Sequence, residues 1–498
     1  MSEPVRPDPQ LARLLPYHFA KARGVIAVRR EAQAARVWVR GDVQAATLAE
    51  VRRILGQPLH AEQLSDRQFE QSLAQVYARS DSATANLMID GVEQELDLQQ
   101  LAQEIPEITD LMDAEDDAPV IRLINALLTQ ALREHASDIH IEPFETRSVV
   151  RFRVDGTLRD IIEPQRALHA ALVSRIKVMA QLDIAEKRLP QDGRITLRVA
   201  GRPVDVRVST LPTGHGERAV LRLLDKQAGR LELSSLGTNA ECLAAVDEMV
   251  HQPHGIFLVT GPTGSGKTTT LYAALSQLDA KVMNIMTVED PIEYDLDGVG
   301  QTQVNPRIDM TFARALRTIL RQDPDVIMIG EIRDLETAQI AVQASLTGHL
   351  VLATLHTNTA AGAVLRLTDM GVEPYLLASS LLGVLGQRLV RRLCPECRKP
   401  HLPDAAEQAL LGPHAAATIY SPVGCPACNF SGYRGRTGIF ELFRVDEALR
   451  RMIHDGAGEQ SLRDYLAAQG VASLRQDGMR RVASGETSLE EVLRATRE

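Results

Sequence analysis

A glycine-rich stretch, GPTGSGKTTTL at Gly261–Leu271, has the spacing of a loop that binds phosphate groups. It lies directly after the apolar run GIFLVT and before a helical segment, which is where such a loop must lie. The glycines allow backbone N–H groups to curl around the β- and γ-phosphates at a helix N-terminus, while Lys267 adds a positive charge and Thr268 offers its hydroxyl to Mg²⁺. A glycine-rich turn without a ligand is the alternative, and the flanking strand and helix disfavour it. The predicted nucleotide-binding residues are Gly261, Pro262, Thr263, Gly264, Ser265, Gly266, Lys267, Thr268 and Thr269.

Three more apolar runs of this region end in acidic residues or histidine. VMNIMTVED ends in Glu289 and Asp290, with Glu293 shortly after; DVIMIG is followed by Glu331; and LVLATL is followed by His356. Short apolar runs separated by helical segments are typical of parallel strands covered on both faces, and the carboxyl ends of such strands form the edge where α/β sheets bind ligands. These side chains are therefore expected to face the bound nucleotide.

Glu331 stands where many ATPases have an aspartate that holds Mg²⁺. A lone strand-end glutamate is more often an ordinary loop carboxylate, and a lone histidine is more often satisfied by a backbone carbonyl. Three such strand ends beside one phosphate-binding loop favour function. We predict that Glu331 binds Mg²⁺ through a water and that Glu289 orients or activates the attacking water; Glu293 and His356 are further candidates.

Four of the five cysteines form two close pairs, CPEC at Cys394 and Cys397 and CPAC at Cys425 and Cys428. Each pair has two intervening residues, and 27 residues separate the pairs. This is the spacing of a closed, tetrahedral zinc site, which is structural because no coordination position stays open. Four unrelated reduced thiols are the alternative. The fifth cysteine, Cys242, is expected to be a buried or partly buried thiol.

The chain divides into segments of different character. We predict an N-terminal partner-binding domain at 1–103, an acidic linker at 104–118, an α+β domain at 119–228, a linker at 229–240 and an α/β domain at 241–498 with the cysteine element at 391–437. The α+β domain begins with a helix at Pro119, and its alternating segments predict antiparallel strands with one wet face. Most of its arginines are explained as a solvated strand face: Arg151, Arg153, Arg194, Arg198, Arg202 and Arg207.

The bulk composition is that of an average soluble chain. The sequence has 498 residues, 44% hydrophobic and 24% charged, and its length suggests roughly three domains. The longest apolar stretches are shorter than the roughly 20 residues that cross a bilayer, and the N-terminus lacks an apolar segment for export, so a cytoplasmic location is expected. A net charge of -10 disfavours a nucleic-acid partner.

Four ordered motifs give the chain a specific resemblance from about Pro119 to its C-terminus. The phosphate-binding loop, VEDPIEY, DPDVIMIGEIRD and TGHLVLATLHTN together resemble the type II/type IV secretion ATPase superfamily, and specifically the assembly ATPases of type II secretion and type IV pili. The Gly-Glu that ends the third motif is normal in that family. A tetracysteine zinc element is typical of the assembly branch, and GRTGIFELF after the cysteines also resembles it.

The resemblance implies a RecA-like α/β ATPase domain with a zinc-bearing C-terminal subdomain, preceded by an α+β PAS-like domain and a small N-terminal domain. It implies a homo-hexameric motor that uses ATP, Mg²⁺ and Zn²⁺, in which arginines of the PAS-like domain reach the phosphates when that domain closes. Arg194 in PQDGR and Arg207 in VDVRVST are the best matches, and the solvated-sheet explanation stays open for both.

The N-terminal stretch LARLLPYHFAKARGVIAV resembles the start of type II secretion ATPases, and the modest length also favours them over pilus enzymes. The function expected is therefore an ATPase at the cytoplasmic face of the inner membrane that powers pseudopilus assembly and protein export. Its N-terminal domain would bind the cytoplasmic part of an inner-membrane secretion protein, and a platform protein of the same membrane would be a second partner. A pilus assembly ATPase, a nucleic-acid translocase and a nucleotide-gated scaffold with negligible turnover are the alternatives.

Overall fold

The computed structural model describes parts of residues 11–72, residue 98, residues 118–225 except 200 and 201, and residues 232–497 except 415. The predicted acidic linker lies outside the described residues apart from its last position. Contacts group the chain into two compact units: one contains Met1–Arg133, Ile139–Val150 and Asp160–Leu221, and the other contains Glu134–Asp138, Arg151–Arg159 and Arg222–Glu498. The domain boundaries predicted above stay predictions.

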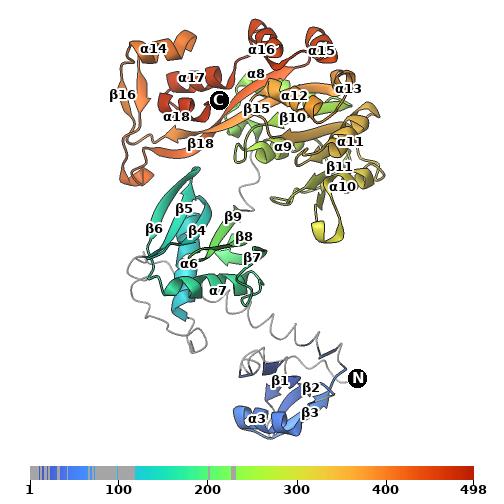
Figure 1. Ribbon diagram of the computed structural model, residues 1–498, viewed down its shortest axis with the longest axis vertical. Coiled ribbons are helices and arrows are strands. Elements are labelled where there is room, and N and C mark those ends of the chain that lie inside the picture. Colours follow the sequence, from blue (N-terminus) through green and yellow to red (C-terminus); the bar gives the residue numbers. More distant parts are fainter. Residues whose placement is uncertain are drawn as a thin grey trace. The chain divides into compact units, whose positions relative to one another are not determined.

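The N-terminal region contains a small α/β fold (Figure 1). Strand β2 pairs antiparallel with β1 and parallel with β3. Val25 and Val37 of the first two strands pack in one buried cluster with Val51 of the helix. The elements are β1 (Val25–Arg30), β2 (Ala35–Val39), α3 (Ala45–Leu55) and β3 (Leu59–Gln63).

A six-stranded sheet with two helices follows, in the strand order β6-β5-β4-β9-β8-β7. Helix α6 begins at Ala118, and its apolar residues at helical spacing are buried: Val120, Leu123, Ile124, Leu127, Leu128 and Ala131. Strands β7 and β8 pair antiparallel, as predicted. The elements are α6 (Ala118–Arg133), β4 (Ala136–Pro143), β5 (Ser148–Val154), β6 (Thr157–Ile162), α7 (Leu168–Met179), β7 (Gln191–Val199), β8 (Arg202–Thr213) and β9 (Gly216–Asp225).

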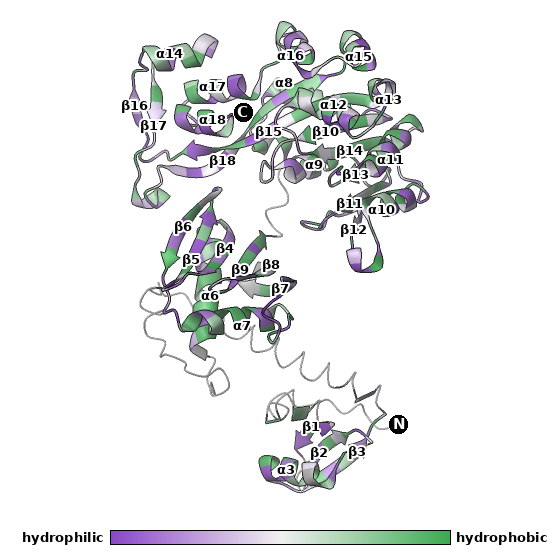
Figure 2. Cartoon of the chain, in the orientation of Figure 1, coloured by the Kyte–Doolittle hydropathy of each residue, from purple (hydrophilic) through white to green (hydrophobic). Residues whose placement is uncertain are grey.

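The C-terminal part is built on a seven-stranded sheet in the order β12-β11-β13-β14-β10-β15-β18. Every pair of neighbours is parallel except β15 and β18. The four apolar runs predicted to be parallel strands are all present: β10 (Gly255–Thr260), β11 (Ile285–Glu289), β13 (Val326–Ile329) and β14 (Leu350–Leu355). Figure 2 shows these strands as mainly hydrophobic in the interior of this part of the chain.

Helices cover both faces of this sheet, which explains why its strands lack an apolar–polar alternation. Along β10, Ile256 and Leu258 pack on one face with α10, α11 and α12, while Phe257 and Val259 pack on the other with α8 and α9. The helices are α8 (Ala240–Val250), α9 (Lys267–Leu275), α10 (Phe312–Ile319), α11 (Leu335–Leu346), α12 (Ala360–Asp369) and α13 (Pro374–Ser380), with short turns η1 (Leu233–Leu236) and η2 (Pro306–Ile308) and the edge strand β12 (Gly300–Gln303).

The two last strands form a long antiparallel ladder, and the segment between them carries the cysteines. The ladder runs from the pair Gly383 and Arg444 to the pair Leu393 and Tyr433. The remaining elements are β15 (Leu381–Leu393), β16 (Lys399–His401), α14 (Ala405–Leu411), η3 (Gly412–His414), β17 (Ile419–Ser421), η4 (Pro426–Cys428), β18 (Tyr433–Arg444), α15 (Glu447–His454), α16 (Glu459–Ala468), α17 (Leu474–Ala483) and α18 (Leu489–Ala495).

Among the helices that the structure describes, none combines the length and the apolar character that crossing a bilayer would need.

Candidate active site

The glycine-rich loop joins β10 to α9 at the carboxyl edge of the parallel sheet. Gly266 lies immediately before the helix with a φ of 87°, and Gly264 has a φ of 78°, so both adopt the left-handed conformation that glycine tolerates best. The first backbone N–H groups of an α-helix have no acceptor within the helix, so an anion at the start of α9 could accept hydrogen bonds from them. The Ser265 hydroxyl is buried, and no residue that the structure describes forms a hydrogen bond with it. A phosphate oxygen would satisfy it, so the loop fits the predicted ligand.

Lys267 is the first residue of α9, and only 8% of it is exposed. Its Nζ donates to the carbonyl oxygens of Gly261 at 2.8 Å and Pro262 at 3.0 Å. Burial lowers the pKa of Lys267 to about 8; the negative charge of Glu331 acts in the opposite direction, and the positive charge of Arg388 makes a smaller contribution to the lowering. The two groups that accept from Lys267 are thus neutral carbonyl oxygens, and a bound phosphate would give its ammonium group a negatively charged partner.

Glu331 and His356 contact each other at the edge of the sheet. They follow the adjacent strands β13 and β14, and His356 Nε2 lies 3.2 Å from Glu331 Oε2. Arg333 donates to the other carboxylate oxygen of Glu331. The Glu331 side chain is 14% exposed. Its negative charge acts on Lys267 of the nucleotide loop, where it raises the pKa.

Glu289 lies at the end of β11 but is almost completely buried, with 2% exposed. Its carboxylate accepts hydrogen bonds from the Tyr272 hydroxyl, the Thr287 hydroxyl and, at 3.1 Å, the Gln301 amide. Burial raises the pKa of Glu289, and these three donors act in the opposite direction. Glu293 follows in the loop and is partly exposed. The sequence offered no signal for the Tyr272 and Gln301 contacts, because both partners are distant along the chain.

The two predicted arginines of the PAS-like domain are direct neighbours. Arg194 on β7 lies opposite Arg207 on β8 in the antiparallel register. Two like charges in such a pair repel each other, and the buried carboxylate of Asp205 compensates by accepting from Arg194 at 2.6 Å and from Thr196 at 2.7 Å. The solvated-face interpretation stays a prediction for Arg198 and Arg202, whose side chains lie outside the described part.

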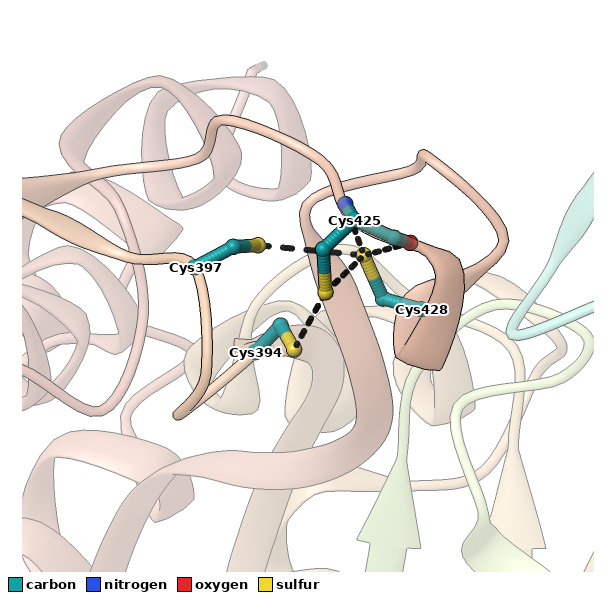
Figure 3. A group of neighbouring side chains, drawn as sticks. All are labelled: Cys394, Cys397, Cys425 and Cys428. Carbon is teal, nitrogen blue, oxygen red and sulfur yellow. Dashed lines mark hydrogen bonds between the residues drawn. The ribbon is translucent and has the colours of Figure 1, made fainter.

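The four cysteines that the sequence singled out come together (Figure 3). Their sulfur atoms all lie within 4.8 Å of one another, with distances of 3.9 Å from Cys394 to Cys425, 3.8 Å from Cys397 to Cys428 and 3.7 Å from Cys425 to Cys428. Zn–S bonds of about 2.3 Å in a tetrahedron require sulfurs about 3.8 Å apart. The donor set and the spacing therefore fit a zinc ion.

Backbone N–H groups already prepare this cluster for negative charge. Gly424 donates to the Cys397 sulfur at 3.3 Å, and Cys425 and Gly432 both donate to the Cys428 sulfur at 3.2 Å. Burial alone would raise the pKa of Cys428, but these donors outweigh it and lower the pKa to about 6. Cys242 lies outside the cluster and is buried, as expected, with its pKa raised to about 12 by burial.

Strand β15 contributes two residues to the site that the sequence analysis missed. The Gln387 amide oxygen accepts from the Thr270 hydroxyl of α9 at 2.7 Å, and Arg388 donates to the Asn358 side chain at 3.0 Å. Thr260, the last residue of β10, lies opposite Gly386 on β15, so Gln387 and Arg388 lie beside the start of the nucleotide loop. A polar residue directly after a strand is the usual sequence signal of a site residue. Gln387 and Arg388 do not give this signal, because β15 continues to Leu393.

Comparison with known proteins identifies the family of the chain. A family model described as Type II/IV secretion system protein matches residues 113–494, and a second model, for an N-terminal domain of GSPII protein E, matches residues 14–77. The chain is 62% identical over 485 residues to Type II secretion system protein HxcR of Pseudomonas aeruginosa, covering 97% of this chain and 99% of the relative. It is 56% identical over 492 residues to Type II secretion system ATPase E of Vibrio cholerae, covering 98% of each.

Solved structures share the fold. The pilus retraction motor PilT, solved with bound ADP, is 26% identical with a TM-score of 0.51, over 75% of this chain and 97% of that one. The ATPase DotB of Legionella pneumophila has a TM-score of 0.56 at 21% identity, over 74% of this chain and 94% of that one, which supports the fold alone. The predicted fold class, a RecA-like α/β domain preceded by an α+β domain and a small N-terminal domain, is confirmed. This chain belongs to the Type II/IV secretion system protein family, and it is an ATPase of the type II secretion kind.

Proposed function

We propose that this ATPase is a homo-hexameric motor at the cytoplasmic face of the inner membrane that powers pseudopilus assembly and protein export. The observation that carries the proposal is the match of both the N-terminal region and the ATPase part to type II secretion proteins. The N-terminal domain would bind the cytoplasmic part of an inner-membrane secretion protein, and the platform protein of that membrane would receive the mechanical work. The net charge of -10 argues against a nucleic-acid client.

The site residues suggest how ATP would be handled. The loop Gly261–Thr269 would hold the phosphates, with Lys267 exchanging its two carbonyl partners for phosphate oxygens. Thr268 and Glu331 would hold Mg²⁺, which neutralises charge on the phosphates when bound. His356 keeps Glu331 oriented through their 3.2 Å contact. Arg194 and Arg207 are proposed to reach the phosphates from the PAS-like domain.

The role predicted for Glu289 requires one further condition. To orient or activate the attacking water, its carboxylate would have to give up at least one of the three donors that now surround it. Glu293, the neighbouring acid in the partly exposed loop, stays a second candidate.

The client of the motor can be tested by deleting the gene in its host and complementing with wild type or Lys267→Ala. We expect loss of exoprotein release with surface pili intact, restored by wild type alone, because nucleotide binding requires the lysine. Exoprotein release and pilus display are measured in the same strains. Loss of pili with release intact would instead assign the protein to pilus assembly.

Replacing Glu331 with Gln should lower kcat by about 100-fold or more, because the carboxylate charge beside Mg²⁺ is lost. The affinity for a non-hydrolysable ATP analogue should stay within about threefold, since the phosphate loop is untouched. Glu373→Gln is the matched control, because Glu373 is an exposed glutamate at the start of α13. Unchanged hydrolysis by Glu331→Gln would refute the role proposed for this residue.

The affinity for ATP should depend on pH above neutrality because the pKa of free Lys267 is lowered to about 8. Below that pH the lysine is charged and binding is constant; above it, the free protein loses the proton that the complex retains, so the dissociation constant rises by up to about tenfold per pH unit. Titrations of the analogue from about pH 6.5 to about pH 9.5 bracket this pKa and measure the effect. In Lys267→Arg the remaining affinity should be independent of pH, since guanidinium stays charged. An equal slope in both proteins would contradict the assignment.

One zinc ion is expected per chain, held by Cys394, Cys397, Cys425 and Cys428. Since a structural metal contributes folding energy directly, its removal should lower the unfolding temperature by about 5 °C or more. Elemental analysis and thermal melts of the wild type, Cys425→Ser and the control Cys242→Ala test this, and only Cys425→Ser should lose metal. A wild-type melting curve that does not change when the metal is removed would contradict the prediction of a structural zinc site.

A further inference from the structure

Arg388 lies beside the nucleotide loop because β15 runs parallel to β10. Thr260, the last residue of β10, is opposite Gly386, so the next residues of β15 accompany the loop as it leaves the sheet. The approach is close: a Cβ atom on Gly261 would lie 2.4 Å from the Gln387 carbonyl oxygen. The hydrogen bond from Thr270 to the Gln387 side chain, at 2.7 Å, fixes this register from the helix side. The backbone of Arg388 is therefore held in place next to the loop.

The guanidinium of Arg388 donates to a neutral residue, Asn358. One of its nitrogens donates to the carbonyl and side-chain oxygens of Asn358, at 3.3 and 3.0 Å, and its Nε is buried without a hydrogen-bond partner among the described residues. No carboxylate pairs with Arg388 in the part of the chain that the structure describes. Arg388 is half-buried, and partial removal of a charge from water without a counter-charge has a cost, so desolvation lowers the pKa of this arginine. The guanidinium is therefore available to bind an anion.

Its surroundings indicate which anion. The positive charge of Arg388 acts on Lys267, the lysine of the phosphate loop. Its partner Asn358 lies two residues after His356, which contacts Glu331 at 3.2 Å. Strand β14, which leads into His356 and Asn358, lies between β10 and β13 in the sheet. Arg388 is thus placed where the loop lysine and the Glu331–His356 pair converge, at the end of the loop where the terminal phosphate would sit.

We propose that Arg388 is a second cationic contact to the nucleotide from the same chain and that it binds the γ-phosphate of ATP. The guanidinium offers several donors in a fixed plane, and its Nε and the nitrogens not used by Asn358 can meet phosphate oxygens. ADP lacks this phosphate, so Arg388 contributes to the preference for ATP over ADP. The inference rests on the ATPase activity and is independent of which client the motor serves.

Binding measurements on the full-length chain test this. Titration calorimetry with a non-hydrolysable ATP analogue and with ADP, both with Mg²⁺, should show that Arg388→Gln weakens the analogue by about 10- to 100-fold and ADP by less than about threefold. Arg388→Lys keeps the charge but loses the planar fork, so an intermediate and still selective loss is expected. Arg392→Gln is the matched control, because Arg392 lies on the same strand and pairs with Glu486 at 3.5 Å. It should bind both nucleotides as the wild type does.

Equal weakening of both nucleotides, or no weakening of the analogue, would overturn the proposal and leave Arg388 as a structural partner of Asn358. Thermal melts identify a variant that has lost its fold; if Arg388→Gln is one, the selectivity of Arg388→Lys decides in either direction. The secretion proposal fails separately, since a strain can lose that function while the purified chain keeps its selective loss of ATP binding.

Discussion

The close approach between β15 and the phosphate loop is the constraint on which the site depends. Gly261 and Gly266 both have positive φ, and a Cβ atom would lie 2.4 Å from the Gln387 carbonyl oxygen at the first position and 2.9 Å from its side-chain nitrogen at the second. A larger side chain at these positions would separate the loop from the strand, so the glycines serve two purposes: they allow the loop to curl, and they let β15 contact it. The buried hydrogen bond between Thr270 and Gln387 then joins helix, loop and strand into one unit.

The same strand connects the nucleotide site to the cysteine cluster. Past Gln387, β15 continues to Leu393 and is followed at once by Cys394, while the second cysteine pair lies just before β18. The antiparallel ladder of β15 and β18 therefore has the cysteines at one end and the nucleotide loop along its length. A metal at that end would close the connection between the two strands and reduce the entropy that the pairing costs. This gives a structural metal a physical route to influence a site in which it takes no chemical part.

The features predicted from the sequence are those encoded by local spacing or by periodicity. The phosphate loop and the cysteine pairs are spaced motifs. The four apolar runs mark parallel strands whose carboxyl ends must share an edge, so Glu331 and His356 were expected at that edge, whereas the contact between them is known from the structure alone. Gln387 and Arg388 could not be predicted from strand ends, because β15 does not end beside the loop but continues and pairs with β18. The partners of Glu289 could not be predicted either, because the contact with Tyr272 depends on how α9 packs on the sheet, and the spacing of residues in the sequence does not specify this packing.

The surroundings of the two strand-end glutamates separate their roles. Glu331 contacts Arg333 and His356, and its charge already acts on the loop lysine. Glu289 is enclosed by three donors, and burial favours its neutral form. A carboxylate that must lose a donor before it meets water bears the free-energy cost of that step, whereas Glu331 needs no such step to approach Mg²⁺. Because Tyr272 is part of the helix that begins with Lys267, any shift of α9 on nucleotide binding would alter the enclosure of Glu289. The buried glutamate is therefore the one whose availability depends on the state of the phosphate loop.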